Sequence, residues 1–159
     1  MQTAHKKAFT MIELIFVIVI IGILAAIAIP KLAATRDDAE VSKIVVNEEM
    51  LLRAFQAYYT SQDNAKWKSE TIDKVISLPF GVTNCSTLVT ASTQISPNTF
   101  VLCHNNVVCL SFVTTDEGNL TITDGSSSTD SICEAVKALP ASRVISNHTY
   151  RLAGRTIKR

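Results

Sequence analysis

The chain has 159 residues, of which 47% are hydrophobic and 18% charged, and its formal net charge is +1. This length fits one domain of about 100–150 residues with an appendage. Basic and acidic residues are interspersed and form no basic stripe, so the sequence does not support direct contact with nucleic acid. Hydrolase, zinc-protease and phosphate-loop motifs are also absent from the sequence, and we predict that the chain is not an enzyme.

The apolar residues are concentrated near the N-terminus. Phe9–Ile29 contains a single charged residue, Glu13. As a helix this segment would span about 31 Å at about 1.5 Å per residue, which matches the hydrocarbon thickness of a bilayer. Lys6 and Lys7 precede it and place the short N-terminal side in the cytoplasm by the positive-inside rule. We therefore predict one membrane-spanning helix, with the rest of the chain on the outer side.

Two ordinary explanations compete for this segment. A cleavable secretory signal has a basic start, an apolar region of about 7–15 residues and an Ala-x-Ala exit, which residues 26–28 supply. It would release a secreted, disulfide-bonded binding domain after Ala28. The apolar run is longer than such a signal needs and contains Glu13, whereas a plain membrane anchor explains the length but not the carboxylate.

The residue order of positions 6–32 resembles the N-terminus of type IV prepilins and pseudopilins. The matching pieces are KKA at 6–8, FTMIEL at 9–14, Gly22, and AAIAIP at 25–30. The resemblance implies that a prepilin peptidase cuts between Ala8 and Phe9 and that the new amino group of Phe9 is N-methylated. One position departs from the pattern, because the family usually has Gly before the cut where this chain has Ala8.

Glu13 is the costly residue of this segment. A carboxylate in hydrocarbon costs about 2.5–3.5 kcal/mol on insertion scales, so an intramembrane acid is a functional candidate. Cleavage before Phe9 would create an α-amino cation four residues away. The resemblance implies that Glu13 pairs with the N-terminal amine of the neighbouring subunit and sets the axial register. The alternative is that Glu13 lies near the membrane surface and reaches water.

Gly22 and Pro30 bracket the second half of the anchor. Pro30 removes a helical hydrogen bond and is expected to kink the helix, and Gly22 weakens it by about 1 kcal/mol relative to Ala. The resemblance implies that the stretch between them can unwind in an assembled filament. Alternatively, Gly22 and the nearby alanines form a small-residue face for helix packing in lipid.

After Pro30 the pattern becomes amphipathic, which predicts one long helix from about Thr10 to Thr60 with its outer half packed on a small domain. The apolar positions recur every three to four residues: Val41, Ile44, Val45, Leu51, Leu52, Phe55, Tyr58 and Tyr59. Glu48 interrupts them, and the heptads are not clean enough for a coiled coil. The aromatic end of the helix is expected to be core.

The second half of the chain predicts a small antiparallel sheet. A connecting loop with a short helix is expected over Gln62–Pro79, and a second short helix over Ser131–Leu139, stopped by Pro140. The expected strands are 99–103, 107–112, 119–123 and 143–152, with hairpin turns at 104–106 and 116–119. This is an α+β arrangement in agreement with the pilin fold.

The predicted organisation has four parts: a cytoplasmic leader at 1–8, a membrane-spanning and filament-core helix at 9–30, its amphipathic continuation at 31–60, and a β-rich head at 61–159.

The four cysteines all lie in the predicted head. An even number beyond an export-type segment predicts two disulfides in an oxidising compartment. Three pairings are possible, of which we favour Cys109–Cys133 and Cys85–Cys103. A zinc site at Cys103, His104 and Cys109 is the alternative, but the spacing of five between its cysteines is wider than zinc pairs favour.

The turns of the predicted head contain two further candidate sites. Four acidic residues offer oxygen ligands of the kind calcium prefers: Asp116, Glu117, Asp124 and Asp130. Major pseudopilins carry calcium in a C-terminal loop, but without EF-hand spacing solvated turn residues are the better interpretation, and no cofactor is predicted. Asn119-Leu120-Thr121 is a glycan acceptor motif, preceded by the acidic Glu117.

We therefore expect a structural subunit of a type IV pilus-like or type II secretion pseudopilus filament, most simply a pseudopilin or minor pilin. The resemblance implies other pilin or pseudopilin subunits, a prepilin peptidase, the lipid bilayer, and an inner-membrane platform protein driven by an assembly ATPase as partners. It places the anchor in the inner membrane and the head in the periplasm or outside. Secretion, DNA uptake in competence, and adhesion or motility stay open as roles.

Overall fold

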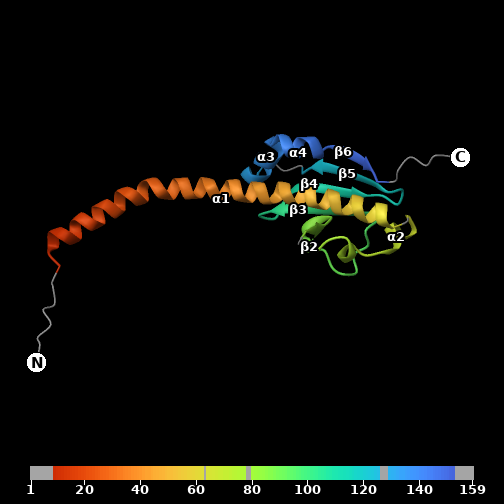
Figure 1. Ribbon diagram of the computed structural model, residues 1–159, viewed down its shortest axis with the longest axis horizontal. Helices are drawn as coiled ribbons and strands as arrows, with labels where there is room; N and C mark the ends of the chain where they lie inside the picture. Colours follow the sequence, from red (N-terminus) through yellow and green to blue (C-terminus); the bar gives the residue numbers. More distant parts are fainter. Residues whose placement is uncertain (1–8, 63, 78–79, 126–128, 153–159) are drawn as a thin grey trace, which may run out of the picture. The chain divides into compact units, whose positions relative to one another are not determined.

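The computed structural model describes residues 9–62, 64–77, 80–125 and 129–152 (Figure 1). Its contacts divide the chain into two compact units, Met1–Ala39 and Glu40–Arg159. The first contains the beginning of the longest helix, and the second contains the end of that helix together with the sheet and the short helices.

Helix α1 runs from Met11 to Ser61. Strongly aliphatic residues and alanines fill its first half, and the backbone is helical through both Gly22 and Pro30. A proline inside a helix removes one backbone hydrogen bond and crowds the preceding turn, yet α1 continues without a break through Pro30. The long helix predicted from about Thr10 to Thr60 is therefore confirmed within one residue at each end.

The last part of α1 buries a single stripe of side chains in the second unit. The buried positions follow the alternating spacing of three and four residues that places side chains on one helix face: Val41, Ile44, Glu48, Leu51, Leu52 and Phe55. Phe55 contacts Phe100 of the sheet at a ring-centroid distance of 5.7 Å. The predicted packing of the outer half of the helix on the head is thus confirmed (Figure 1).

The sheet has six strands in the order β2-β1-β3-β4-β5-β6, and every neighbouring pair is antiparallel. The strands are β1 (Gly81–Val82), β2 (Asn84–Leu88), β3 (Asn98–His104), β4 (Val107–Thr114), β5 (Asn119–Asp124) and β6 (His148–Arg151). The three central strands predicted from the sequence are confirmed as β3, β4 and β5. Strands β1 and β2 are short and mostly polar, and they were not predicted from the sequence.

Two turns of the sheet need left-handed backbone conformations. Asn105 and Asn106 join β3 to β4 with φ angles of 46° and 64°. A two-residue hairpin turn of this kind favours asparagine, whose short polar side chain tolerates positive φ. Gly118 has a φ of 75°, and a Cβ at this position would lie 2.4 Å from the ring of Tyr59. Only glycine fits there.

In the described part of the second unit there are also four short helical segments: α2 (Asn64–Ser69), the 3₁₀ helix η1 (Ile72–Lys74), α3 (Ser131–Ala138) and α4 (Pro140–Ile145). The strand expected over 143–152 is wrong in its first residues, because 143–145 belong to α4 and the strand β6 begins at His148. Pro140 stops α3 but also starts α4, since proline at the first helical position has no amide bond to lose.

The core of the second unit is aromatic. Trp67 from α2 is fully buried between Phe55 and Tyr59 of α1, with ring centroids 5.9 and 5.3 Å apart, respectively. Its indole Nε1–H donates a hydrogen bond of 2.9 Å to the carbonyl oxygen of Thr115, at the end of β4. The aromatic end of α1 is therefore core, as expected.

Candidate functional site

The first turn of α1 is closed by a reciprocal pair of hydrogen bonds between Thr10 and Glu13. The Thr10 hydroxyl accepts from the Glu13 backbone N–H at 3.3 Å, and the Glu13 carboxylate accepts from the Thr10 backbone N–H at 2.9 Å. The Thr10 hydroxyl also donates to the same carboxylate oxygen at 2.8 Å. Because α1 begins at Met11, Thr10 is the N-cap and Glu13 is the third helical residue, so the pair is a capping box.

The capping box was missed from the sequence, although its signal, Thr-x-x-Glu before an apolar run, is present at residues 10–13. It places the Glu13 carboxylate on the backbone of Thr10, the residue that follows Phe9. Phe9 is 85% exposed. Ala8, the other residue of the expected cleavage site, lies outside the described residues.

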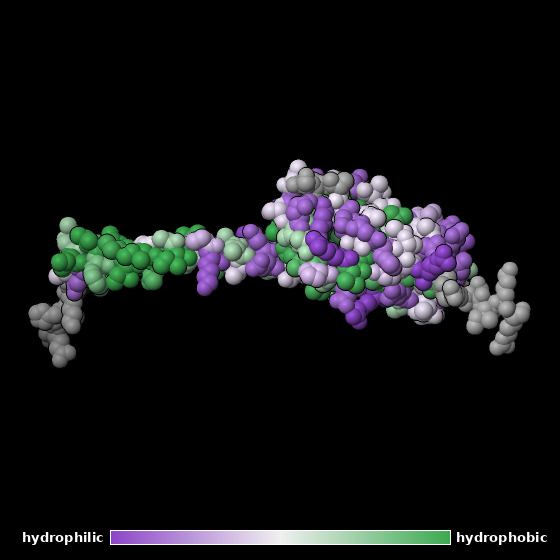
Figure 2. All heavy atoms as spheres, turned by 90° about the horizontal axis from the view of Figure 1, so that it is seen from above, coloured by the Kyte–Doolittle hydropathy of each residue, from purple (hydrophilic) through white to green (hydrophobic). Residues whose placement is uncertain are grey.

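The side chains that follow form an exposed apolar surface around the helix. Large hydrophobic side chains from Met11 to Leu32 are between 42% and 80% exposed, and Figure 2 shows the apolar colouring over this segment. Its most apolar window has a mean hydropathy of 3.1, with no residue buried, so α1 is long and apolar enough to cross a membrane. Apolar surface of this extent is typical of a membrane or protein interface rather than of a surface in water.

Gly22 lies within this apolar segment, and a Cβ added to it would have no atom within 4 Å. Its small size therefore serves no contact inside the chain. Pro30 lies toward the end of the segment, and helix α1 continues through it.

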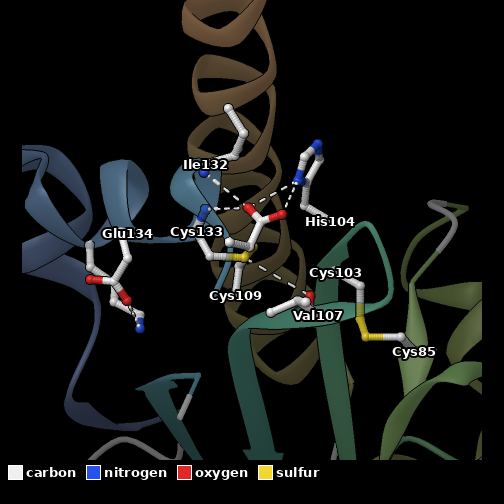
Figure 3. Close-up of a disulfide and its surroundings, with 10 residues drawn as sticks. Cys85, Cys103, His104, Val107, Cys109, Ile132, Cys133 and Glu134 are labelled. Atoms are coloured by element: carbon white, nitrogen blue, oxygen red, sulfur yellow. Dashed lines mark hydrogen bonds and ion pairs between the residues drawn. A yellow bond between two sulfur atoms is a disulfide. The ribbon is translucent and has the colours of Figure 1, made fainter. Parts of the chain in front are cut away.

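Both disulfides are present in the head. Cys85 of β2 is bonded to Cys103 of β3, and Cys109 of β4 is bonded to Cys133 of α3 (Figure 3). These are the pairs favoured from the sequence. Since no cysteine is free, the alternative zinc site at Cys103 and Cys109 has no thiolate ligands.

The start of α3 is tied to the sheet by Asp130. Its Oδ1 accepts hydrogen bonds of 3.0 Å from the N–H groups of Ile132 and Cys133, and its Oδ2 lies 2.9 Å from Nδ1 of His104. Figure 3 shows His104 beside the beginning of α3. Burial alone would raise the pKa of Asp130, but the two backbone donors and His104 outweigh it and hold the pKa below its ordinary value.

The acidic turn residues considered for calcium do not come together. Asp116 accepts a hydrogen bond from the Ser96 hydroxyl, Asp124 accepts from the Asn147 side chain, and Asp130 caps α3. Within the described part of the chain, no group of three or more histidine, cysteine or acidic side chains is placed to hold a metal ion.

Asn119, the residue considered as a glycan acceptor, opens β5 and is only half-exposed. Its side-chain amide donates to Glu117 at 3.4 Å, and its backbone pairs with Arg151 of β6.

Glu48 is a titratable residue whose position the sequence did not reveal. The sequence pattern predicts that Glu48 interrupts the apolar stripe of α1. In the structure its side chain is 0% exposed and lies within that stripe. Burial raises the pKa of its carboxyl group to about 7; the nearby Ser142 hydroxyl opposes the rise and the Asp124 carboxylate adds to it. The sequence did contain a signal for this burial, because the glutamate lies four residues after one aliphatic residue of the stripe and three residues before the next.

Known proteins resemble part of the chain. The family described as "Prokaryotic N-terminal methylation motif" matches residues 3–29. Over 79 residues the chain is 29% identical to type II secretion system core protein G of Aeromonas hydrophila, covering 50% of this chain and 55% of that protein. Over 74 residues it is 35% identical to type IV major pilin protein PilE1 of Neisseria gonorrhoeae, covering 46% of this chain and 44% of that protein.

The chain thus spans about half the length of the curated relatives it matches. No solved structure matches it. The motif and these relatives nevertheless confirm the resemblance predicted from residues 6–32: the chain carries a prepilin-type N-terminal motif and is similar over part of its length to a type II secretion core protein and to a type IV major pilin.

Proposed function

We propose that the chain is a subunit of a type IV pilus-like or type II secretion pseudopilus filament. In this proposal residues 1–8 are a leader, the leader is cut between Ala8 and Phe9, and the new amino group of Phe9 is methylated. Residues 9–30 then form the membrane anchor and later the filament core, and the head is carried outside the cytoplasm.

The observation that carries the proposal is the exposed apolar surface of α1 from Met11 to Leu32. Such a surface needs a covering that excludes water, and a bilayer before assembly or neighbouring helices after assembly can provide it. Because lipid and protein contacts are similarly apolar, the exchange between them does not expose the helix to water. The same segment can therefore serve as an anchor and as a polymer interface.

Glu13 gives this apolar surface one directional contact. Both hydrogen bonds that Thr10 donates to Glu13 end on its Oε2 atom, so within the described residues Oε1 remains open to a further donor. An α-amino cation at Phe9, on its own chain or on a neighbour, would neutralise the carboxylate in a low-dielectric surrounding. Pairing with a neighbour would fix the axial position of one subunit against the next.

The proposed steps of membrane insertion, leader cleavage and assembly each require a partner. A prepilin peptidase would process the leader, and other pilin or pseudopilin subunits would pack against the apolar segment. Extraction from the membrane needs energy, which an assembly ATPase would supply through an inner-membrane platform protein. The similarity to both core protein G and a major pilin supports this class of filament and leaves the machine that it serves open.

Mass spectrometry of the mature N-terminus tests the proposal. We expect the chain recovered from a host with a prepilin peptidase to begin at Phe9 and to carry an added methyl group. A mature chain that begins at Ile29 would instead support the secreted binding domain released after Ala28. An Ala8→Gly variant is the matched control, since it restores the usual residue before the cut and should be processed at the same bond at least as fast.

A further inference from the structure

Glu48 lies in the centre of the buried stripe of α1. It follows Ile44 by four residues and precedes Leu51 by three, and all three side chains face the core of the second unit. Its side chain is 0% exposed, and within the described residues neither carboxylate oxygen has a hydrogen-bond partner. An ionised carboxylate in this position has lost its water, and the nearby Ser142 hydroxyl offsets this loss only in part, so ionisation is unfavourable.

Among the described residues, the groups that face Glu48 do not supply a positive charge. They are the Ser142 hydroxyl of α4, the Asp124 carboxylate at the end of β5 and the Tyr150 phenol of β6. Tyr150 donates its hydroxyl proton to the carbonyl oxygen of Ile145 at 3.1 Å, so that proton is already used. A second carboxylate nearby makes ionisation of Glu48 still less favourable.

A protonated Glu48 removes this conflict. The neutral acid carries one O–H donor, and two buried oxygen atoms near it lack a partner within the described residues, Asp124 Oδ1 and Ser142 Oγ. The acid can donate to an oxygen of this kind, whereas the ionised form can only accept from the Ser142 hydroxyl and faces the Asp124 carboxylate. Glu48 therefore fits its site better as the acid.

We propose that Glu48 makes the packing of α1 on the head depend on pH, being protonated in the packed head and loosening this packing when it ionises. The loosening would separate α1 from helix α4 and from strands β5 and β6 at one edge of the sheet. This inference concerns the head alone and does not rest on the filament function.

The direction of the effect follows from the two protonation equilibria. The pKa of the carboxyl group is about 7 in the packed head and 4.5 where it is exposed. Below about pH 4.5 both forms hold the proton and packing is undisturbed. Between these values the opened form loses its proton first, so packing weakens as the pH rises, and above about pH 7 the loss is complete. The difference of 2.5 pKa units corresponds to a shift of about two orders of magnitude in the opening equilibrium.

Hydrogen exchange of the full chain in detergent micelles measures this opening directly. Exchange rates of amides in residues 41–55 and in α4, corrected for the intrinsic effect of pH, are compared between pH 5 and pH 8.5. In the wild type we expect protection to fall by about 100-fold across this range. A wild-type protection that does not change with pH would overturn the proposal.

Two variants assign the effect to Glu48. Glu48→Gln keeps the shape but cannot ionise, and we expect it to lose the pH dependence and to be better protected than the wild type at pH 8.5. Glu49→Gln is the matched control, because Glu49 is exposed and pairs with Arg53, and it should keep the wild-type pH dependence. His104 and His148 are unchanged in both variants. A Glu48→Gln protein with the wild-type pH dependence would overturn the proposal.

Infrared spectroscopy of the wild type provides a measurement that needs no folded variant. A protonated carboxylic acid has its own carbonyl band, and we expect one such band to persist in the folded chain well above pH 5 and to disappear near pH 7. If every carboxyl band is lost by about pH 5, Glu48 is ionised in the packed head and the proposal is wrong.

Discussion

Residues 11–32 and residues 41–55 belong to one helix and share one backbone conformation, yet their side chains meet different surroundings. In the first segment apolar side chains point in all directions and stay exposed. In the second they form one stripe that is buried against aromatic and aliphatic residues of the sheet, with polar residues on the opposite side. Helix propensity does not distinguish the two, but the distribution of apolar residues around the helix does.

The comparison indicates how stability and function are divided. The second unit has a closed core, two disulfides and an aromatic cluster, so its stability comes from its own contacts. The first segment has a capping box at its start and, within the described residues, no burial of its large apolar side chains. Substitutions in the head should therefore change folding, whereas substitutions in residues 9–32 should change insertion and assembly.

The largest expected effect is the loss of filaments on removal of Glu13. Glu13→Ala deletes the charge and also half of the capping box. We expect the filaments collected by sedimentation to be too few to detect by electron microscopy, whereas the fold of the head should be unchanged. The control Glu13→Gln separates these roles, because glutamine can still accept the Thr10 N–H but carries no charge. Wild-type filament yield from Glu13→Gln would contradict charge pairing with an N-terminal amine and leave capping as the role of Glu13.

The residue order in positions 6–32 was enough to predict the resemblance to prepilins and pseudopilins, because a carboxylate within an apolar run that follows a basic leader is rare and physically costly. The central strands were predictable because β-branched and aromatic residues lie between clear turn signals. Strands β1 and β2 were not, since their sequence, Gly81–Leu88, is polar and short and owes its strand conformation to pairing with β3.

Two other features were beyond sequence reasoning for separate reasons. Helix α4 was missed because Pro140 ends one helix and starts the next, and a proline carries both signals. The burial of Glu48 was hidden because a glutamate on an apolar stripe usually lies at its edge. Only the packing of α4, β5 and β6 around that position places it inside.

A matched pair of glycine substitutions sharpens the comparison between the two regions. Gly118→Ala forces alanine into a φ of 75° and places its Cβ 2.4 Å from the Tyr59 ring, so we expect a loss of about 4 kcal/mol from strain and overpacking together. Gly22→Ala meets no atom within 4 Å and should strengthen the helix by about 1 kcal/mol. Chemical unfolding of the full chain in detergent measures the stability of the head in each variant.

The head should respond to Gly118→Ala alone, with Gly22→Ala leaving its unfolding midpoint in place. If Gly22→Ala lowered that midpoint as much as Gly118→Ala does, the two regions would not be energetically separate. A reduced filament yield from Gly22→Ala with an unchanged midpoint would support a role for Gly22 in unwinding or close packing of the assembled helices.

The smallest expected effect concerns Asp130, whose lowered pKa makes it the opposite of Glu48. Its carboxylate is stabilised by the Cys133 and Ile132 N–H groups and by His104. The contribution of this carboxylate to the stability of the fold is therefore present above pH 3.8, the ordinary pKa, and is lost as the pH falls through the lower pKa of the folded state. Asp130→Ala removes the cap of α3 and should cost about 1 kcal/mol at pH 7. Asp130→Asn keeps an acceptor for the two N–H groups and should lose less. The wild type itself loses this contribution in acid. The difference in unfolding midpoint between the wild type and Asp130→Ala should therefore become smaller below pH 3.8. Midpoints that differ equally at pH 7 and pH 2.5 would contradict the assigned role of the charge.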